Sequence, residues 1–146
     1  MNKLNWCKQQ QKGIELVEPN NNLSKKYFLE AEDTLKLIEG KKTKWELIQG
    51  YYVCYNSLYA LLMKAGIKCE IHSCTIELMK YIEEFSEGDY KFLSDLKEKR
   101  IRAQYYLEKI LLDSVQSIKQ FYLKCKKIEQ DLNIKKLRGV INEQEN

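Results

Sequence analysis

The segment KRIRAQYY, residues 99–106, gathers the side chains that are best suited to chemistry in this sequence. Its polar and aromatic members are Arg100, Arg102, Gln104, Tyr105 and Tyr106. Arg100 and Gln104 are four residues apart, so on a helix they share a face, with Tyr105 near it. Guanidinium groups beside phenols suit phosphate oxygens and stacked bases. The segment therefore predicts a nucleotide- or RNA-binding surface, although the same residues also suit arginine stacked on tyrosine in a seam between helices.

The sequence contains one histidine, His72, just before a helix that we expect to begin near Ser73. Its side chain can cap that helix or pack in the preceding loop. It can also pair with Cys54 or Cys74 as base and nucleophile, but no third residue that would orient such a pair is evident. Because buried cysteines are usually inert, we do not expect a cysteine nucleophile.

Neither a metal nor a cofactor is expected. A single histidine cannot make a two-histidine metal site, and the six glycines are scattered rather than gathered in a phosphate-binding loop. The five cysteines are odd in number and lack CxxC spacing, so neither a zinc site nor a disulfide framework is suggested. No segment resembles a signal peptide or a membrane span. We therefore expect a cytoplasmic protein without a membrane partner, whose reduced thiols act as small hydrophobes.

Composition favours a single all-α domain over residues 1–146. Charged residues make up 32% of the chain and aromatic residues 11%, which is typical of a globular protein, and a single proline leaves little from which to build tight turns. The net charge of +4 is too small to indicate a nucleic-acid-binding protein by itself. Its distribution is more informative, because basic residues cluster at 97–102 and along 119–138. Solvated helix faces are the alternative explanation for both clusters.

The helices that must position these residues are organised around the apolar segment 45–65. One stripe at helical spacing consists of Ile48, Tyr52, Tyr55, Tyr59 and Leu62. A second stripe beside it consists of Tyr51, Cys54, Leu58, Leu61 and Ala65. A helix that is apolar around most of its circumference is normally the most buried one. Because a buried tyrosine hydroxyl needs a hydrogen-bond partner, the four phenols predict a polar seam or groove at the edge of the core.

The rest of the chain divides into helices joined by short connectors. We expect an N-terminal arm at 1–22, helices at 23–38, 73–85, 90–112 and 115–132, and a frayed tail at 134–146. Together with the central helix, these segments predict an antiparallel up-and-down bundle of four to five main helices.

Two segments together resemble a known family. GYYVCYNSLYALLMKAGIKCEIHSC at 50–74, followed by RIRAQYYL at 100–107, is similar to the HEPN domain, and most of all to its small stand-alone prokaryotic and archaeal members. The resemblance covers most of the chain and depends on the order and spacing of several motifs. It implies a HEPN-like helical bundle, a homodimer, and a partnership with a minimal nucleotidyltransferase in a toxin–antitoxin-like module.

The resemblance also implies a site. Active toxins of the family are metal-independent ribonucleases with an R-x4–6-H motif, whose arginine corresponds to Arg100. Tyr105 stands where the histidine is expected, and a phenol with a pKa near 10 is a poor base at neutral pH. We therefore expect a weakly catalytic or non-catalytic protein that binds a nucleotidyltransferase, a nucleotide or RNA. The alternatives are a ribonuclease with an altered site of Arg100, Arg102, Tyr105 and His72, and an interaction module without a ligand.

Overall fold

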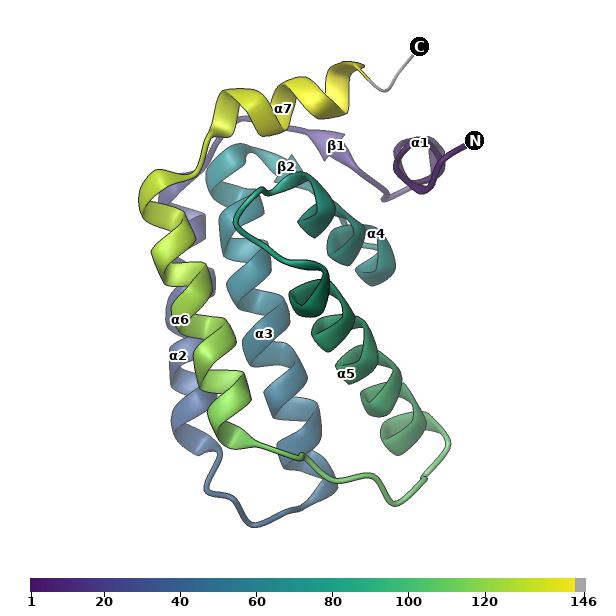
Figure 1. Ribbon diagram of the computed structural model, residues 1–146, viewed down its shortest axis with the longest axis vertical. Coiled ribbons are helices and arrows are strands. Elements are labelled where there is room, and N and C mark those ends of the chain that lie inside the picture. The colour runs from purple at the N-terminus through teal and green to yellow at the C-terminus, as the bar shows by residue number, and fades with distance from the viewer. Residues whose placement is uncertain (144–146) are drawn as a thin grey trace.

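The structure is a computed structural model that describes residues 1–143, and these are mostly helical (Figure 1). The helices are α1 (Lys3–Gln9), α2 (Asn21–Leu37), α3 (Lys44–Ala65), α4 (His72–Glu77), the 3-10 helix η1 (Leu78–Tyr81), α5 (Glu87–Tyr105), α6 (Val115–Asp131) and α7 (Ile134–Glu143). Two short strands, β1 (Glu15–Leu16) and β2 (Ile67–Lys68), pair antiparallel. The all-α class that composition predicts is confirmed.

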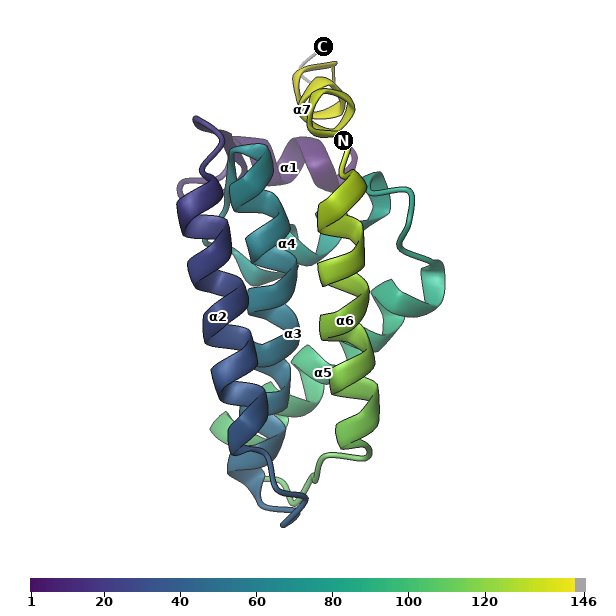
Figure 2. The ribbon, with the colours of Figure 1, turned by 90° about the vertical axis from the view of Figure 1, so that its left-hand side faces the viewer.

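Helix α3 lies at the centre of the molecule and contacts α2, α5 and α6 (Figures 1 and 2). The four long helices α2, α3, α5 and α6 alternate in direction along the chain. Segments 38–43 and 106–114 connect them at one end, which we call the lower end. The opposite, upper end carries α1, the two strands, α4 and α7.

The burial of α3 agrees with its two apolar stripes. Thr43 Oγ1 accepts a hydrogen bond from the Glu46 N–H and caps the helix, and Gly66 ends it in the left-handed conformation at φ 74°. Sixteen of its 22 residues are buried. Nine of the ten residues in the two stripes are buried within the chain, and Tyr52 is partly buried. The homodimer that the sequence predicts stays a prediction.

The predicted polar seam is present beside α3. The Tyr55 hydroxyl donates to Thr75 Oγ1 at 3.0 Å, and the Tyr59 oxygen accepts from the backbone N–H of Cys69 at 3.1 Å. The Tyr51 hydroxyl lies 2.8 Å from His72 Nδ1. All three partners belong to α4 or to the loop before it, so the seam is the boundary between α3 and this part of the chain.

Two predicted helices differ in extent from those in the structure. The helix predicted at 90–112 begins at Glu87, because Ser86 and Asp89 cap each other's backbone N–H groups, and it ends at Tyr105. Leu107 then adopts a positive φ of 55°, which an α-helix does not accommodate, so 106–114 is an irregular connection. The helix predicted at 73–85 is replaced by the short helices α4 and η1.

The tail that was predicted to fray is helical over 134–143, and residues 144–146 lie outside the described part. Leu137 and Ile141 of α7 are buried. Arg138 Nη1 donates to the carbonyls of Val17, Ala65 and Gly66 at 2.7–3.0 Å. These bonds satisfy carbonyls at the C-terminal end of α3 and attach both chain termini to it.

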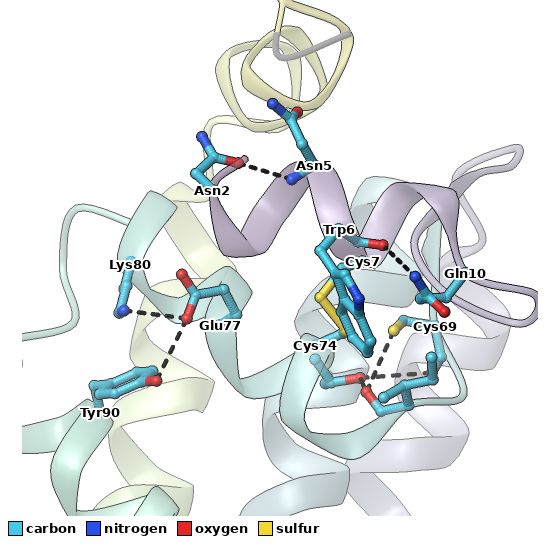
Figure 3. Close-up of a disulfide and its surroundings, with 12 residues drawn as sticks. Asn2, Asn5, Trp6, Cys7, Gln10, Cys69, Cys74, Glu77, Lys80 and Tyr90 are labelled. Carbon is cyan, nitrogen blue, oxygen red and sulfur yellow. Dashed lines mark hydrogen bonds and ion pairs between the residues drawn. A yellow bond between two sulfur atoms is a disulfide. The ribbon is translucent and has the colours of Figure 1, made fainter.

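The expectation that all five thiols are reduced is wrong for two of them. Cys7 of α1 and Cys74 of α4 form a disulfide, although 67 positions separate them in the sequence (Figure 3). Spacing along the chain could not indicate this pair, because α1 and α4 meet only in the folded protein. Cys54, Cys69 and Cys125 are free and buried, as expected.

Replacing Leu58 tests the central position of α3. The side chain is fully buried, so Leu58→Ala should lower the free energy of unfolding by about 2–5 kcal/mol through the cavity it leaves. Chemical denaturation measures this loss. Leu123→Ala, at a half-exposed leucine of α6, is the matched control and should cost less than about 0.5 kcal/mol. Equal losses in the two variants would contradict the assignment.

Removing the disulfide should destabilise the folded protein. The double variant Cys7→Ser, Cys74→Ser should lose about 2–4 kcal/mol of unfolding free energy, because the cross-link restricts the unfolded chain. Thiol titration of the unreduced, denatured wild type should count three free cysteines. A count of five, with stability unchanged by a dithiol reductant, would show that the bond does not form.

Candidate functional site

Arg100 lies on α5 with its guanidinium group in the core. The residue is 6% exposed, and its Cζ lies 4.7 Å from the ring centroid of Tyr51 and 5.6 Å from that of Tyr52. Nη1 donates to Gln104 Oε1 at 3.2 Å, as their spacing predicts, but the buried Nε has no hydrogen-bond partner. Within residues 1–143, no carboxylate forms an ion pair with this arginine. A buried arginine without an acidic partner is unusual in a protein core.

His72 is the first residue of α4 and packs against α3. Its ring stacks on that of Tyr55, with centroids 3.9 Å apart and an interplanar angle of 15°. The N-cap of α4 is Ile71, and no side chain caps this helix. The capping role considered for His72 is therefore wrong, because its ring faces α3 rather than the free N–H groups of α4. The ring packs on Tyr55 of α3 rather than within the preceding loop.

Tyr51 connects the arginine to the histidine. Arg100 lies over its ring, while its hydroxyl forms the hydrogen bond to His72 Nδ1. The fold thus gathers Arg100, His72, Tyr51, Tyr52 and Tyr55, which we call the Arg100–His72 cluster. The phenols on the central helix were recognised in the sequence as needing polar partners. Nothing in the sequence indicated that one of them would lie between Arg100 and His72.

Burial sets the charge of the cluster. It lowers the pKa of His72 to about 4, and the positive charges of Arg100 and Lys97 act in the same direction. Burial also raises the pKa values of Tyr51 and Tyr55. At neutral pH the imidazole and both phenols are therefore uncharged. Arg100 is the fixed charge of the cluster, surrounded by neutral groups that can donate or accept hydrogen bonds.

The other predicted site residues lie further out. The Tyr105 ring is 6.0 Å from Arg100 Cζ and its side chain is 66% exposed. Tyr106 is the C-cap residue of α5 and is 73% exposed. Arg102 turns away from the cluster, because its Nε pairs with Glu108 in the connection to α6. The structure therefore brings Arg100, Gln104 and Tyr105 together, pairs Arg102 with Glu108 instead, and leaves Tyr106 exposed at the end of α5.

Within residues 1–143, no group of three or more His, Cys, Asp or Glu side chains is placed to hold a metal ion. None of the helices in this part of the chain combines the length and apolar character that crossing a membrane requires. Compared with protein-family models, with curated proteins and with solved structures, the chain matches none of them.

The titration of His72 tests its burial. Since its pKa of about 4 in the folded protein lies below the value near 6.5 of an unfolded chain, the unfolded state binds more protons between these values. The stability contributed by the neutral imidazole is complete above about pH 6.5 and is lost as the pH falls towards 4. The folded protein's one imidazole should titrate near pH 4 by NMR.

The matched comparison is wild type against His72→Gln. As the pH falls from 7 to 4, the wild type should lose unfolding free energy relative to His72→Gln, because only the wild type has this imidazole. Contributions from carboxylates are the same in both proteins and cancel. An NMR midpoint near 6.5 would place the imidazole in water and contradict the packing on Tyr55.

Proposed function

We propose that this chain is a HEPN-like protein that binds a nucleotide or RNA through a phosphate held at Arg100, and that it is weakly catalytic or non-catalytic. The observation that carries the proposal is the buried guanidinium group without an acidic partner and with a free N–H at Nε. A desolvated cation of this kind attracts an anion strongly, because little water screens it. Its planar fork matches the geometry of phosphate oxygens.

The surroundings of Arg100 fit an exchangeable anion. Its acceptor in the structure is the neutral amide oxygen of Gln104, at the long distance of 3.2 Å. The bond to Gln104 has one ionised partner, whereas a phosphate oxygen would add its own negative charge and attract the guanidinium group more strongly. A phosphate oxygen would therefore compete with Gln104 Oε1 for this donor. The exposed Tyr105 and the amide of Gln104 are the groups that would have to move.

The charge state of His72 favours binding over catalysis. An imidazole whose pKa is about 4 is neutral at pH 7 but is a weak base, and it cannot serve there as a protonated general acid.

The altered ribonuclease is the second candidate. This candidate is favoured by the observation that Arg100 and His72 both contact Tyr51 within one chain. His72 of α4 would then supply the imidazole that the motif lacks at Tyr105.

Partners and location also belong to the proposal. The alternating directions of the four long helices support a HEPN-like bundle, and the resemblance in sequence supports a minimal nucleotidyltransferase partner, a toxin–antitoxin-like module and a homodimer. A cytoplasmic location stays part of the proposal, although the disulfide weakens the argument from reduced thiols on which it was based.

Replacing Arg100 tests the phosphate contact. Loss of one charge-assisted contact should cost roughly 1.5–3 kcal/mol, so Arg100→Ala should weaken binding of a labelled RNA about tenfold or more. Arg100→Lys should restore part of the affinity, because lysine keeps the charge but not the fork. His72→Gln should bind nearly as wild type does. Binding and cleavage are measured at one salt concentration, because phosphate-driven affinity depends steeply on salt.

The control is Lys25→Ala, which removes one exposed charge near the start of α2, at the upper end of the bundle. This variant should bind as wild type does. Circular dichroism verifies that each variant is folded. RNA cleavage by wild type that disappears in His72→Gln would establish the altered ribonuclease instead. Absence of binding to any nucleotide or RNA, with Arg100→Ala behaving as wild type, would leave the interaction module.

A further inference from the structure

The lower end of the bundle exposes a concentration of large apolar and aromatic side chains. Within the described residues, six of the ten large hydrophobic side chains that are exposed belong to this end. They are Leu37, Trp45, Tyr105, Tyr106, Leu107 and Leu111. The apolar spacing of the sequence does not mark Trp45 as a site residue. Its side chain is nevertheless 61% exposed, in the first turn of α3, the most buried helix.

Helix geometry relates Trp45 to the Arg100–His72 cluster. Trp45 precedes Tyr52 by seven residues, so both lie on one face of α3 about 10 Å apart along the axis. Tyr105 follows Arg100 by five residues, about 7.5 Å along α5 towards the same end, because α3 and α5 run in opposite directions. Since Tyr52 and Arg100 are in contact, Trp45 and Tyr105 lie at similar heights on neighbouring helices.

The segments at the lower end carry an excess of positive charge. Segments 37–45 and 97–113 contain eight lysines and arginines but four acidic residues, so together they carry a net charge of +4, which equals that of the whole chain. Lys42, Lys44 and Lys109 form no ion pair among residues 1–143. Lys44 Nζ lies 4.9 Å from the Trp45 ring centroid. The exposed rings are thus accompanied by cations that are available to an anionic partner.

We infer that this end of the bundle binds single-stranded nucleic acid, with one phosphate at Arg100 and unpaired bases stacked on Trp45, Tyr105 and Tyr106. The inference rests on the proposed function, because the Arg100 contact fixes one point of the bound strand. Bases stack on aromatic side chains whatever their sequence, and lysines beside the rings attract the backbone. The surface is therefore a base-stacking site separate from the phosphate contact.

The length and charge of this surface favour a single strand over other occupants of similar chemistry. Bases paired in a duplex keep their faces covered and cannot stack on Trp45. A mononucleotide is too short, since the seven positions from Trp45 to Tyr52, which contacts Arg100, span about 10 Å, or about three nucleotides at a spacing of 3.4 Å. A second copy of the chain would bring two positively charged ends together, which is unfavourable.

The two tryptophans allow a direct test. In the variant Trp6→Phe, Trp45 is the sole tryptophan, and its fluorescence should be quenched when eight-residue oligo-U or oligo-dT is added. An eight-residue abasic oligonucleotide keeps the phosphates but lacks bases, so it should bind the wild type about fivefold or more weakly. A duplex of equal length and uridine monophosphate should also bind more weakly. Oligo-U is RNA and oligo-dT is DNA, and comparing their affinities shows which of these two nucleic acids the protein prefers.

The matched variants are Trp45→Ala and Trp6→Ala. Trp6 is also partly exposed and also has a lysine, Lys3, over its ring, but it lies at the upper end. Trp45→Ala should weaken binding of labelled oligo-U about fivefold or more, whereas Trp6→Ala should leave it unchanged. Since Trp45 is exposed, its replacement should not unfold the protein.

The outcomes separate this inference from the proposed function. Equal affinity for the abasic and normal oligonucleotides, or unchanged Trp45 fluorescence on saturation, would overturn the base-stacking site while leaving the phosphate contact at Arg100. Failure of every oligonucleotide to bind would overturn both. A Trp45 emission that shifts with protein concentration alone would show a second copy on this surface and would also overturn the inference.

Discussion

The hydrogen-bonding demand of the buried tyrosines on α3 is the constraint on which the rest of this structure depends. A phenol that enters the core must find a partner there, because an unpaired hydroxyl is costly in an apolar environment. Tyr51, Tyr55 and Tyr59 find their partners in His72, Thr75 and the backbone of Cys69. The segment that contains α4 is thereby positioned along one side of α3. The location of His72 is a consequence of this requirement.

Arg100 is placed by the same rings. Tyr51 and Tyr52 offer their faces to its guanidinium group, and such contacts offset part of the cost of burying a cation. The burial that keeps water from Arg100 also keeps His72 neutral, so the two effects have one physical origin. An anion that entered the cluster would reduce the repulsion between Arg100 and a protonated imidazole. If the proposed anion binds, its binding and proton uptake by His72 would be coupled.

The two ends of the bundle differ in the contacts that hold them and in the side chains that they expose. At the upper end, the disulfide, the strand pair and the bonds of Arg138 to three carbonyls join both chain termini to α3 and α4. At the lower end, connections with Lys42 and Leu107 in the left-handed region expose aromatic and apolar side chains. A rigid scaffold with exposed, positively charged loops at one end is a common arrangement for recognition. The Arg100–His72 cluster lies between these two parts.

The sequence was enough to predict the all-α class, the buried central helix, the need of its phenols for partners, and the shared helical face of Arg100 and Gln104. Each of these follows from residue type and helical spacing, which act over one or two turns. Tertiary structure alone decided that Cys7 meets Cys74, that α7 packs on the end of α3, and that Tyr51 joins Arg100 to His72. These contacts link residues 21 to 121 positions apart, and no local pattern encodes them. Trp45 shows the same limit, because the apolar spacing that buries the rest of α3 does not reveal that its first turn extends beyond the helices that cover it.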